Sequence, residues 1–124
     1  MTLRKIPRLN GVTGVLRSAA GAPICAVGPR TGWYDWLESG EAKSFRFIGA
    51  AGATCTVIRE NRRQRSGNVI GYWYAHRHVL GALKRVYLGR SVKLSLRVLE
   101  SAAMRLAQLE MDVGEAMPAT EGRA

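Results

Sequence analysis

Residues 69–88 read VIGYWYAHRHVLGALKRVYL, and this stretch decides the fold of the chain. Two runs rich in β-branched and aromatic residues flank the dipeptide Leu80-Gly81, which has the length of a tight hairpin turn. If these two residues form the turn, Val79 pairs with Ala82, and every further pair follows by counting outward along both strands. The sequence therefore predicts a β-hairpin with a defined register.

The predicted register gives the hairpin two unlike faces. The first face is mainly apolar, and its pairs are Arg77 with Lys84, Ala75 with Val86, and Trp73 with Leu88. The second face is aromatic and basic, and its pairs are His78 with Leu83, His76 with Arg85, and Tyr74 with Tyr87, with Tyr72 beyond them. Burying the first face removes the most apolar area from water, at about 25 cal/mol per Å². We therefore expect the first face to pack against a helix and the second to face outward; a turn of odd length would exchange them.

An outward face of Tyr, His and Arg indicates a nucleic-acid-binding surface. Such side chains stack on bases, donate to phosphates and reach base edges in a groove that a two-stranded ribbon can enter. Tyr74, His76 and Arg85 are the candidates for selective contacts. The alternative is that the tyrosines are half-buried cross-strand pairs and the arginines only keep the sheet soluble.

The charge distribution favours the binding interpretation. The 124 residues carry a formal net charge of +10, and the segment 59–93 holds nine Lys or Arg and one acid, Glu60. Such a block attracts a polyanion, and its contribution to affinity falls with salt. We expect phosphate contacts from the loop 62–65 and from Arg90 or Lys93. The full set of predicted binding residues is Arg59, Arg62, Arg63, Arg65, Tyr72, Tyr74, His76, Lys84, Arg85, Tyr87, Arg90 and Lys93.

The rest of the chain predicts an α+β fold. We expect a small antiparallel sheet of three to five strands packed against one C-terminal helix at 95–110, with a short Trp-containing helix at 31–40 before the main sheet. Further strands are expected at 22–28, 44–49 and 53–62, and a mobile loop at 61–68. Residues 1–21 are predicted to be a flexible basic arm or a weak first strand, 22–110 a single nucleic-acid-binding domain, and 111–124 a disordered tail.

Short blocks in fixed order add a family resemblance. They are Trp33-Tyr34-Asp35-Trp36-Leu37, Phe45-Arg46-Phe47, Thr56-Val57-Ile58-Arg59-Glu60 with Arg62-Arg63, Tyr72-Trp73-Tyr74-Ala75-His76-Arg77, Tyr87-Leu88-Gly89-Arg90-Ser91 and Leu94-Ser95-Leu96 through Leu99-Glu100. Over residues 33–109 they resemble the N-terminal module of LuxR-type, MalT-like transcriptional regulators of actinobacteria and related bacteria. The resemblance implies a bacterial regulatory or mobile-element context and carries no activity. The ATPase, repeat region and helix-turn-helix of those regulators do not follow here, so we expect the chain to act alone or with a protein partner in trans.

A looser likeness bears on mechanism. The Tyr-Trp-Tyr-Ala strand, the glycine turn, the basic strand ending in Leu-Gly and the following helix are similar to the arm-type DNA-binding domain of tyrosine recombinases. That domain lays a three-stranded sheet into the major groove. By this analogy, the strands that hold Arg59, Tyr74, His76 and Arg85 would face DNA.

Other classes of function find little support in the sequence. Cys25 and Cys55 lie 30 residues apart without CxxC spacing, so we expect a reduced pair, with a disulfide as the alternative, and no metal site. His76 and His78 could share a metal, but no carboxylate or thiol close in sequence completes a shell. We expect no enzyme and no cofactor; a small nuclease using Glu60 and His76 is the weaker alternative.

No apolar run approaches the roughly 18 residues that span a bilayer, and no secretory signal is present, which predicts a cytoplasmic, nucleoid-associated protein without membrane contact.

The leading hypothesis is sheet-mediated binding of double-stranded DNA by a bacterial transcriptional or mobile-element accessory factor. Tyrosine stacking also suits unpaired bases, so an RNA or single-strand binder is the first alternative. A protein-interaction adaptor or inhibitor that binds an acidic partner is the second.

Overall fold

The computed structural model describes residues 6–39 and 42–123, with side chains as far as Leu109. Its class is α+β, as predicted, but the sheet has seven strands rather than three to five, in the order β3-β2-β1-β4-β5-β6-β7. The sheet is mixed, because β1 runs parallel to β4. The strands are β1 Arg8–Asn10, β2 Val15–Arg17, β3 Pro23–Ala26, β4 Ser44–Ile48, β5 Thr54–Arg63, β6 Val69–Val79 and β7 Ala82–Gly89. The helices are α1 Trp33–Glu38, the 3-10 turn η1 Ser91–Lys93 and α2 Leu96–Arg123.

Two of the additional strands, β1 and β2, lie in the segment predicted to be a flexible arm or a weak strand. The strand alternative is correct for residues 8–17, because Leu9 and Leu16 are fully buried and pair across the two strands. Burial of the two leucines stabilises β1 and β2, which the glycine-rich sequence around them does not favour by itself. Residues 1–5 lie outside the described part of the chain.

The hairpin of β6 and β7 has the predicted register over six pairs, from Val79–Ala82 to Tyr74–Tyr87. Leu80 and Gly81 both have positive φ, 50° and 84°, which is the type I′ geometry of a two-residue hairpin. The prediction of a Trp73–Leu88 pair is wrong, because the register shifts after Tyr74 and Trp73 lies opposite Gly89. A bulge at this place lets both Leu88 and Gly89 be buried.

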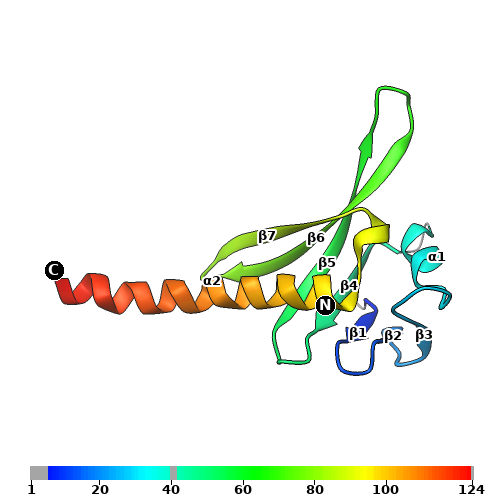
Figure 1. The fold of residues 1–124 in the computed structure, drawn as a ribbon. Coiled ribbons are helices and arrows are strands. Elements are labelled where there is room, and N and C mark those ends of the chain that lie inside the picture. The colour runs from blue at the N-terminus through cyan, green and yellow to red at the C-terminus, as the bar shows by residue number, and fades with distance from the viewer. Residues whose placement is uncertain (1–5, 40–41, 124) are drawn as a thin grey trace.

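Both helices cover the same face of the sheet (Figure 1). One core cluster joins Trp33 and Leu37 of α1 to Leu99 and Leu106 of α2 and to the sheet residues Phe45, Phe47, Val57, Trp73 and Ala75. Trp33 and Trp73 both pack against Phe45, with ring centroids 5.6 and 5.8 Å apart. We call this side the covered face and the other side the open face; the predicted packing of the Trp73 face against the C-terminal helix is confirmed.

Helix α2 begins where it was predicted and ends later. The backbone N–H of Val98 donates to Oγ of Ser95 at 3.2 Å, which caps the first turn. The backbone is helical through Arg123, over much of the segment predicted to be a disordered tail. Once the packed part of a helix has formed, each added residue costs no new nucleation, which allows such an extension. Among the described residues, no helix is both long enough and apolar enough to cross a membrane.

The hairpin of β5 and β6 extends beyond its neighbours. The last pair of β5 with β4 is Ile58–Ser44, yet β5 and β6 stay paired as far as Arg63–Val69. Residues 61 and 62, where the predicted strand and loop overlap, and residue 63, predicted to be loop, are therefore strand. The tip is closed by the N–H of Gln64, which donates to the carbonyl of Asn68 at 2.7 Å. We call residues 60–72 the arm, which stands out from the body of the molecule at the top of Figure 1.

Candidate nucleic-acid interface

Three tyrosines gather on the open face, as the predicted register requires. Tyr74 of β6 and Tyr87 of β7 are cross-strand partners with ring centroids 5.3 Å apart, and Tyr72 lies 6.3 Å from Tyr87. The side of the sheet that holds them is not covered by either helix, and Tyr87 remains 58% exposed. The rings therefore form an aromatic surface that solvent, or a ligand, can reach.

Two arginines lie on these rings. The guanidinium carbon of Arg85 is 4.0 Å from the centroid of Tyr74, and a nitrogen of the same group lies 2.6 Å from Oε2 of Glu60. From the arm, Arg62 donates to the hydroxyl of Tyr74 at 2.9 Å and lies over the ring of Tyr72 at 5.6 Å. Contacts of this kind hold a flexible cation in place before a ligand arrives. We call the three tyrosines with Arg62 and Arg85 the aromatic cluster.

His76 lies beside the aromatic cluster, with its ring 6.4 Å from that of Tyr74. Its Nε2 is buried and has no hydrogen-bond partner among the described residues. Burial and then the charge of Arg85 lower the pKa of His76 from its ordinary 6.5, although Glu60 opposes the shift. His76 is therefore mainly neutral at pH 7 and offers a hydrogen-bonding group rather than a charge.

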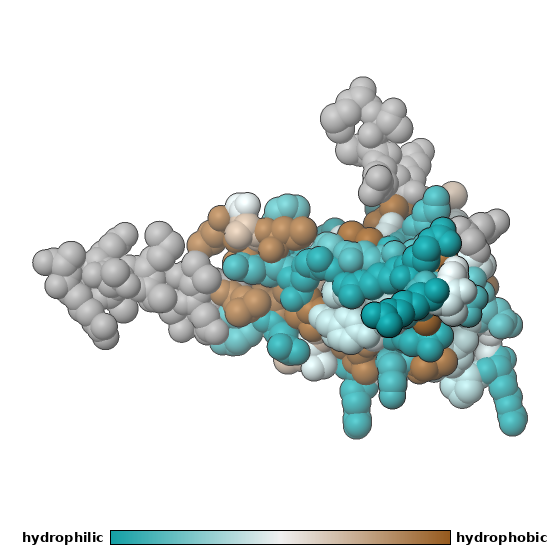
Figure 2. All heavy atoms as spheres, turned by 90° about the horizontal axis from the view of Figure 1, so that it is seen from above, coloured by the Kyte–Doolittle hydropathy of each residue, from teal (hydrophilic) through white to brown (hydrophobic). Residues whose placement is uncertain are grey.

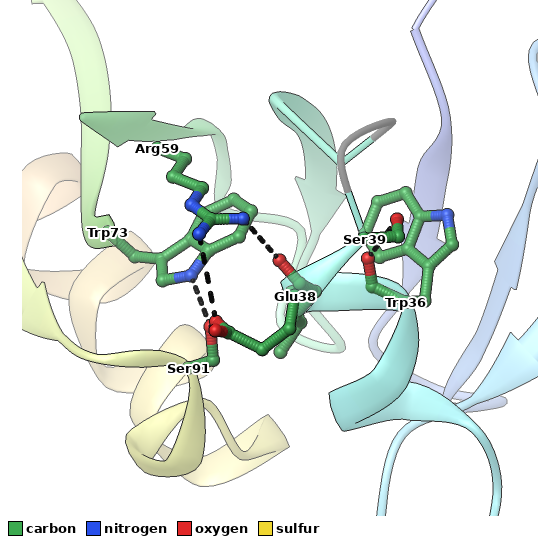
Figure 3. A network of polar contacts seen from close by, with 7 residues as sticks. Trp36, Glu38, Ser39, Arg59, Trp73 and Ser91 are labelled. Carbon is green, nitrogen blue, oxygen red and sulfur yellow. Dashed lines mark hydrogen bonds and ion pairs between the residues drawn. The ribbon is translucent and has the colours of Figure 1, made fainter. Parts of the chain in front are cut away.

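Arg59, predicted to face the ligand, is on the covered face. Its partner across the strands is Trp73, and its guanidinium donates to the carbonyl of Leu37 at 3.0 Å and lies 4.0 Å from Glu38 (Figure 3). The side chain is only 16% exposed, and it lies so close over Gly71 that a Cβ there would be 2.0 Å from Nε. Arg59 thus joins the base of the arm to α1 and cannot reach a ligand on the open face.

The same network fixes Trp73. Its Nε1 donates to Oγ of the buried Ser91 at 2.9 Å, and the Ser91 hydroxyl in turn donates to the carboxylate of Glu38 (Figure 3). Three segments that are distant in sequence, α1, β6 and η1, therefore meet at the base of the arm. These contacts tie the base of the arm to α1 and η1.

Lys84 is the second residue that the site does not include. It pairs with Arg77 on the side that α2 covers, because it alternates with Arg85 along β7.

The remaining predicted cations are exposed but lie apart from the aromatic cluster: Arg63 and Arg65 at the end of the arm, and Arg90 and Lys93 beyond the end of β7. Hydrophilic side chains gather over the arm when the molecule is viewed from above (Figure 2). The structure thus brings together Arg62, Tyr72, Tyr74, His76, Arg85 and Tyr87 from the predicted set.

The open face also holds cations outside the predicted set. Arg8 of β1, Arg17 of β2 and Arg46 of β4 are exposed and lie in register with one another. Each alternates with a buried apolar neighbour, such as Leu9, Leu16 or Phe45, so their outward direction was readable from the sequence. Their common place in one sheet was not, because it depends on the parallel pairing of β1 with β4.

A shallow concavity of about 480 Å³ adjoins His76 on this side of the sheet. Its lining includes Arg46, Thr56, His76, His78 and Leu83. Within the described residues no three His, Cys, Asp or Glu side chains come together as a metal site would need. Cys25 and Cys55 are both free, and burial raises the pKa of the Cys55 thiol to about 12. The concavity therefore offers cationic and hydroxyl groups rather than a thiolate.

Comparison with known proteins gives no neighbour for the chain. No family model matches it, and neither the curated proteins nor the solved structures contain a match. The likenesses to LuxR-type regulators and to recombinase arm domains therefore remain predictions from the sequence, and the open face has to be interpreted from its own chemistry.

Proposed function

We propose that this chain binds double-stranded DNA through the open face of its sheet, and that it has no catalytic activity of its own. The observation that carries the proposal is the aromatic cluster: tyrosine rings with arginines placed on them, on a sheet face that neither helix covers. A strand face that only meets water is normally polar, in alternation with the apolar residues that face the core. The exposed Tyr87 and the half-buried Tyr72 and Tyr74, beside fixed guanidinium groups, are instead suited to sugars, bases and phosphates.

The arm supports a duplex as the ligand. It is a two-stranded ribbon, and B-DNA admits a ribbon of this kind into its major groove, which is about 12 Å wide. Its outer part bears Arg62, Arg63 and Arg65, while its acid, Glu60, lies near the base and is paired with Arg85. A ribbon with a cationic end and an aromatic base can place phosphate contacts on the groove walls and polar contacts toward the base edges.

The biological setting follows only from the family resemblance. We infer a transcriptional or mobile-element accessory role in a bacterial cell, at the nucleoid. A protein partner that acts in trans is compatible with this role, since β7 is the last strand of the sheet and its outer edge pairs with no other strand among the described residues.

Fluorescence anisotropy with a labelled 20-base-pair duplex tests the proposal. Each neutralised phosphate contributes about −0.9 to the slope of log K against log salt concentration, so contacts by five cations give a slope near −4.5. Unlabelled duplex should displace the probe better than single-stranded DNA or RNA of the same sequence. A flat salt dependence, or stronger competition by a single strand, would contradict duplex binding; the second result would favour the RNA or single-strand alternative.

The protein-interaction alternative is separated by the purified protein itself. A nucleic-acid binder of this charge should carry nucleic acid through a low-salt purification, with a raised ratio of absorbance at 260 to 280 nm that falls after a high-salt wash. Retention of a stoichiometric acidic protein with no nucleic acid would point to an adaptor instead.

A further inference from the structure

A row of side chains crosses the open face from one side of the sheet to the other. Strand pairing places Arg17 beside Arg8, Arg8 beside Arg46, and Arg46 beside Thr56. The row then continues through His76 to Arg85 on the last strand. Paired residues point to the same side of a sheet, so all six share the open face. Its first three members, Arg17, Arg8 and Arg46, are the arginine row.

The charges of the arginine row are not compensated within the described residues. None of the three forms an ion pair there, whereas Arg85 is held by Glu60. Arg17 donates to the backbone carbonyl of Gly21 at 3.0 Å, which orients its guanidinium and leaves most of its donors available. With strands about 4.8 Å apart, three like charges lie within roughly 10 Å of one another. Repulsion between them disfavours this arrangement unless an anion binds.

The surface over the arginine row is hollowed on both sides. A concavity of about 440 Å³ is lined by Arg8, Arg17, Asn10, Thr13 and Ser18, and Arg46 lines the second concavity, next to His76. Arg8 and Arg46 are register partners, so the two hollows adjoin. Hydroxyl groups accompany the cations in both concavities, and the amide of Asn10 lines the first, so both offer donors to phosphate oxygens.

We propose that the arginine row is a second phosphate-binding site, which receives the sugar-phosphate backbone of the same DNA duplex that the aromatic cluster contacts. The inference rests on the proposed function and extends it to strands that the sequence did not implicate. Arg17 and Arg85 lie on the first and last of six neighbouring strands, so five spacings of about 4.8 Å place them about 24 Å apart. This distance corresponds to about seven base pairs along the duplex axis at about 3.4 Å per pair. The bound duplex therefore runs across the strands and is contacted at two places, near the arm and at the arginine row.

The test replaces Arg8 and Arg46 together with alanine and measures affinity for the 20-base-pair duplex over a salt series. Loss of two phosphate contacts should make the slope of log K against log salt concentration shallower by about 1.8. The variant should bind more weakly at low salt, and its deficit should shrink about 12-fold between 50 and 200 mM salt, as that slope difference requires. A 6-base-pair duplex, too short to reach both places, should bind wild type and variant alike.

The matched control is Arg97→Ala with Arg105→Ala. Both are exposed on α2, which packs against the covered face, so the control removes the same charge from the other side of the molecule. It should keep the wild-type slope. Arg8→Lys with Arg46→Lys retains the charges and should restore most of the slope, which separates charge loss from misfolding.

Each other outcome contradicts the inference in a recognisable way. An unchanged slope in the alanine variant, with wild-type binding intact, removes the second site and leaves the proposed function standing. Equal losses in the variant and the α2 control show a general effect of net charge. Absence of duplex binding by the wild type overturns both proposals, and a slope change seen with single-stranded RNA alone assigns the arginine row to another ligand.

Discussion

The covered and open faces of the sheet are made by alternate residues of the same strands, yet they have different chemistry. On β6, Trp73 and Ala75 are fully buried under the helices, while Tyr74 and His76, which alternate with them, face outward. On β7, Lys84 and Arg85 are adjacent and lie on opposite sides. The covered face is stabilised by packing. The open face carries large aromatic and cationic side chains that the packing of the core does not require. This difference separates residues that stabilise the fold from residues available to a ligand.

Replacement of an aromatic residue on each face should give the largest contrast. Trp73→Ala removes a buried ring that packs against Phe45 and bonds to Ser91, and should lower the free energy of unfolding by about 3–5 kcal/mol. Tyr87→Ala removes a half-exposed ring with a cross-strand partner, and should cost about 1 kcal/mol or less. Urea denaturation followed by tryptophan fluorescence and circular dichroism measures both. Equal losses would mean that the tyrosines are part of the core and that the two faces do not differ in the way described.

A smaller change in the free energy of unfolding should appear with pH, because the half-buried His76 titrates differently in the folded and unfolded chain. Because the pKa of His76 is lowered in the folded state, the unfolded chain binds more protons between that pKa and 6.5. The contribution of His76 to the free energy of unfolding should be constant above about pH 7 and should fall as the pH drops below 6.5. His76→Gln should reduce this fall, and His78→Gln, at an exposed position on the same face, should leave it in place. Urea denaturation at pH 5.5, 6.5 and 7.5 provides the comparison; an equal fall in wild type and His76→Gln would exclude His76 as the cause.

Much of the hairpin could be predicted from the sequence because one local feature determines it. Leu80-Gly81 fixes the turn, and the turn fixes six pairs and both faces. The prediction of the Trp73–Leu88 pair was wrong because a bulge adds one residue to β7, and the local sequence pattern did not indicate that bulge. The predicted number of strands was wrong for a different reason. β1 joins the sheet through a parallel pairing with β4, and these segments lie more than 30 residues apart, so no local pattern specifies their contact.

The candidate site was partly predictable for the same reason. Tyr72, Tyr74, His76, Arg85 and Tyr87 follow from the register of one hairpin. Arg59 was assigned to the site for its charge, although its position two residues after the buried Val57 already placed it on the covered face. Lys84 was likewise assigned for its charge, although the predicted register already paired it with Arg77 on the covered face. Arg8, Arg17 and Arg46 were missed because their meeting on one face depends on tertiary pairing.

The central claim is that ligand binding belongs to the open face and not to the basic charge of the chain as a whole. The most direct test compares Arg85→Ala with Lys84→Ala, two adjacent positions on β7 that remove the same charge from opposite faces. At 50 mM salt, duplex affinity measured by anisotropy should fall at least 10-fold for Arg85→Ala, as expected for the loss of about 1.5 kcal/mol from a charge-assisted contact, and should change less than 2-fold for Lys84→Ala. Equal losses in the two variants would contradict the account.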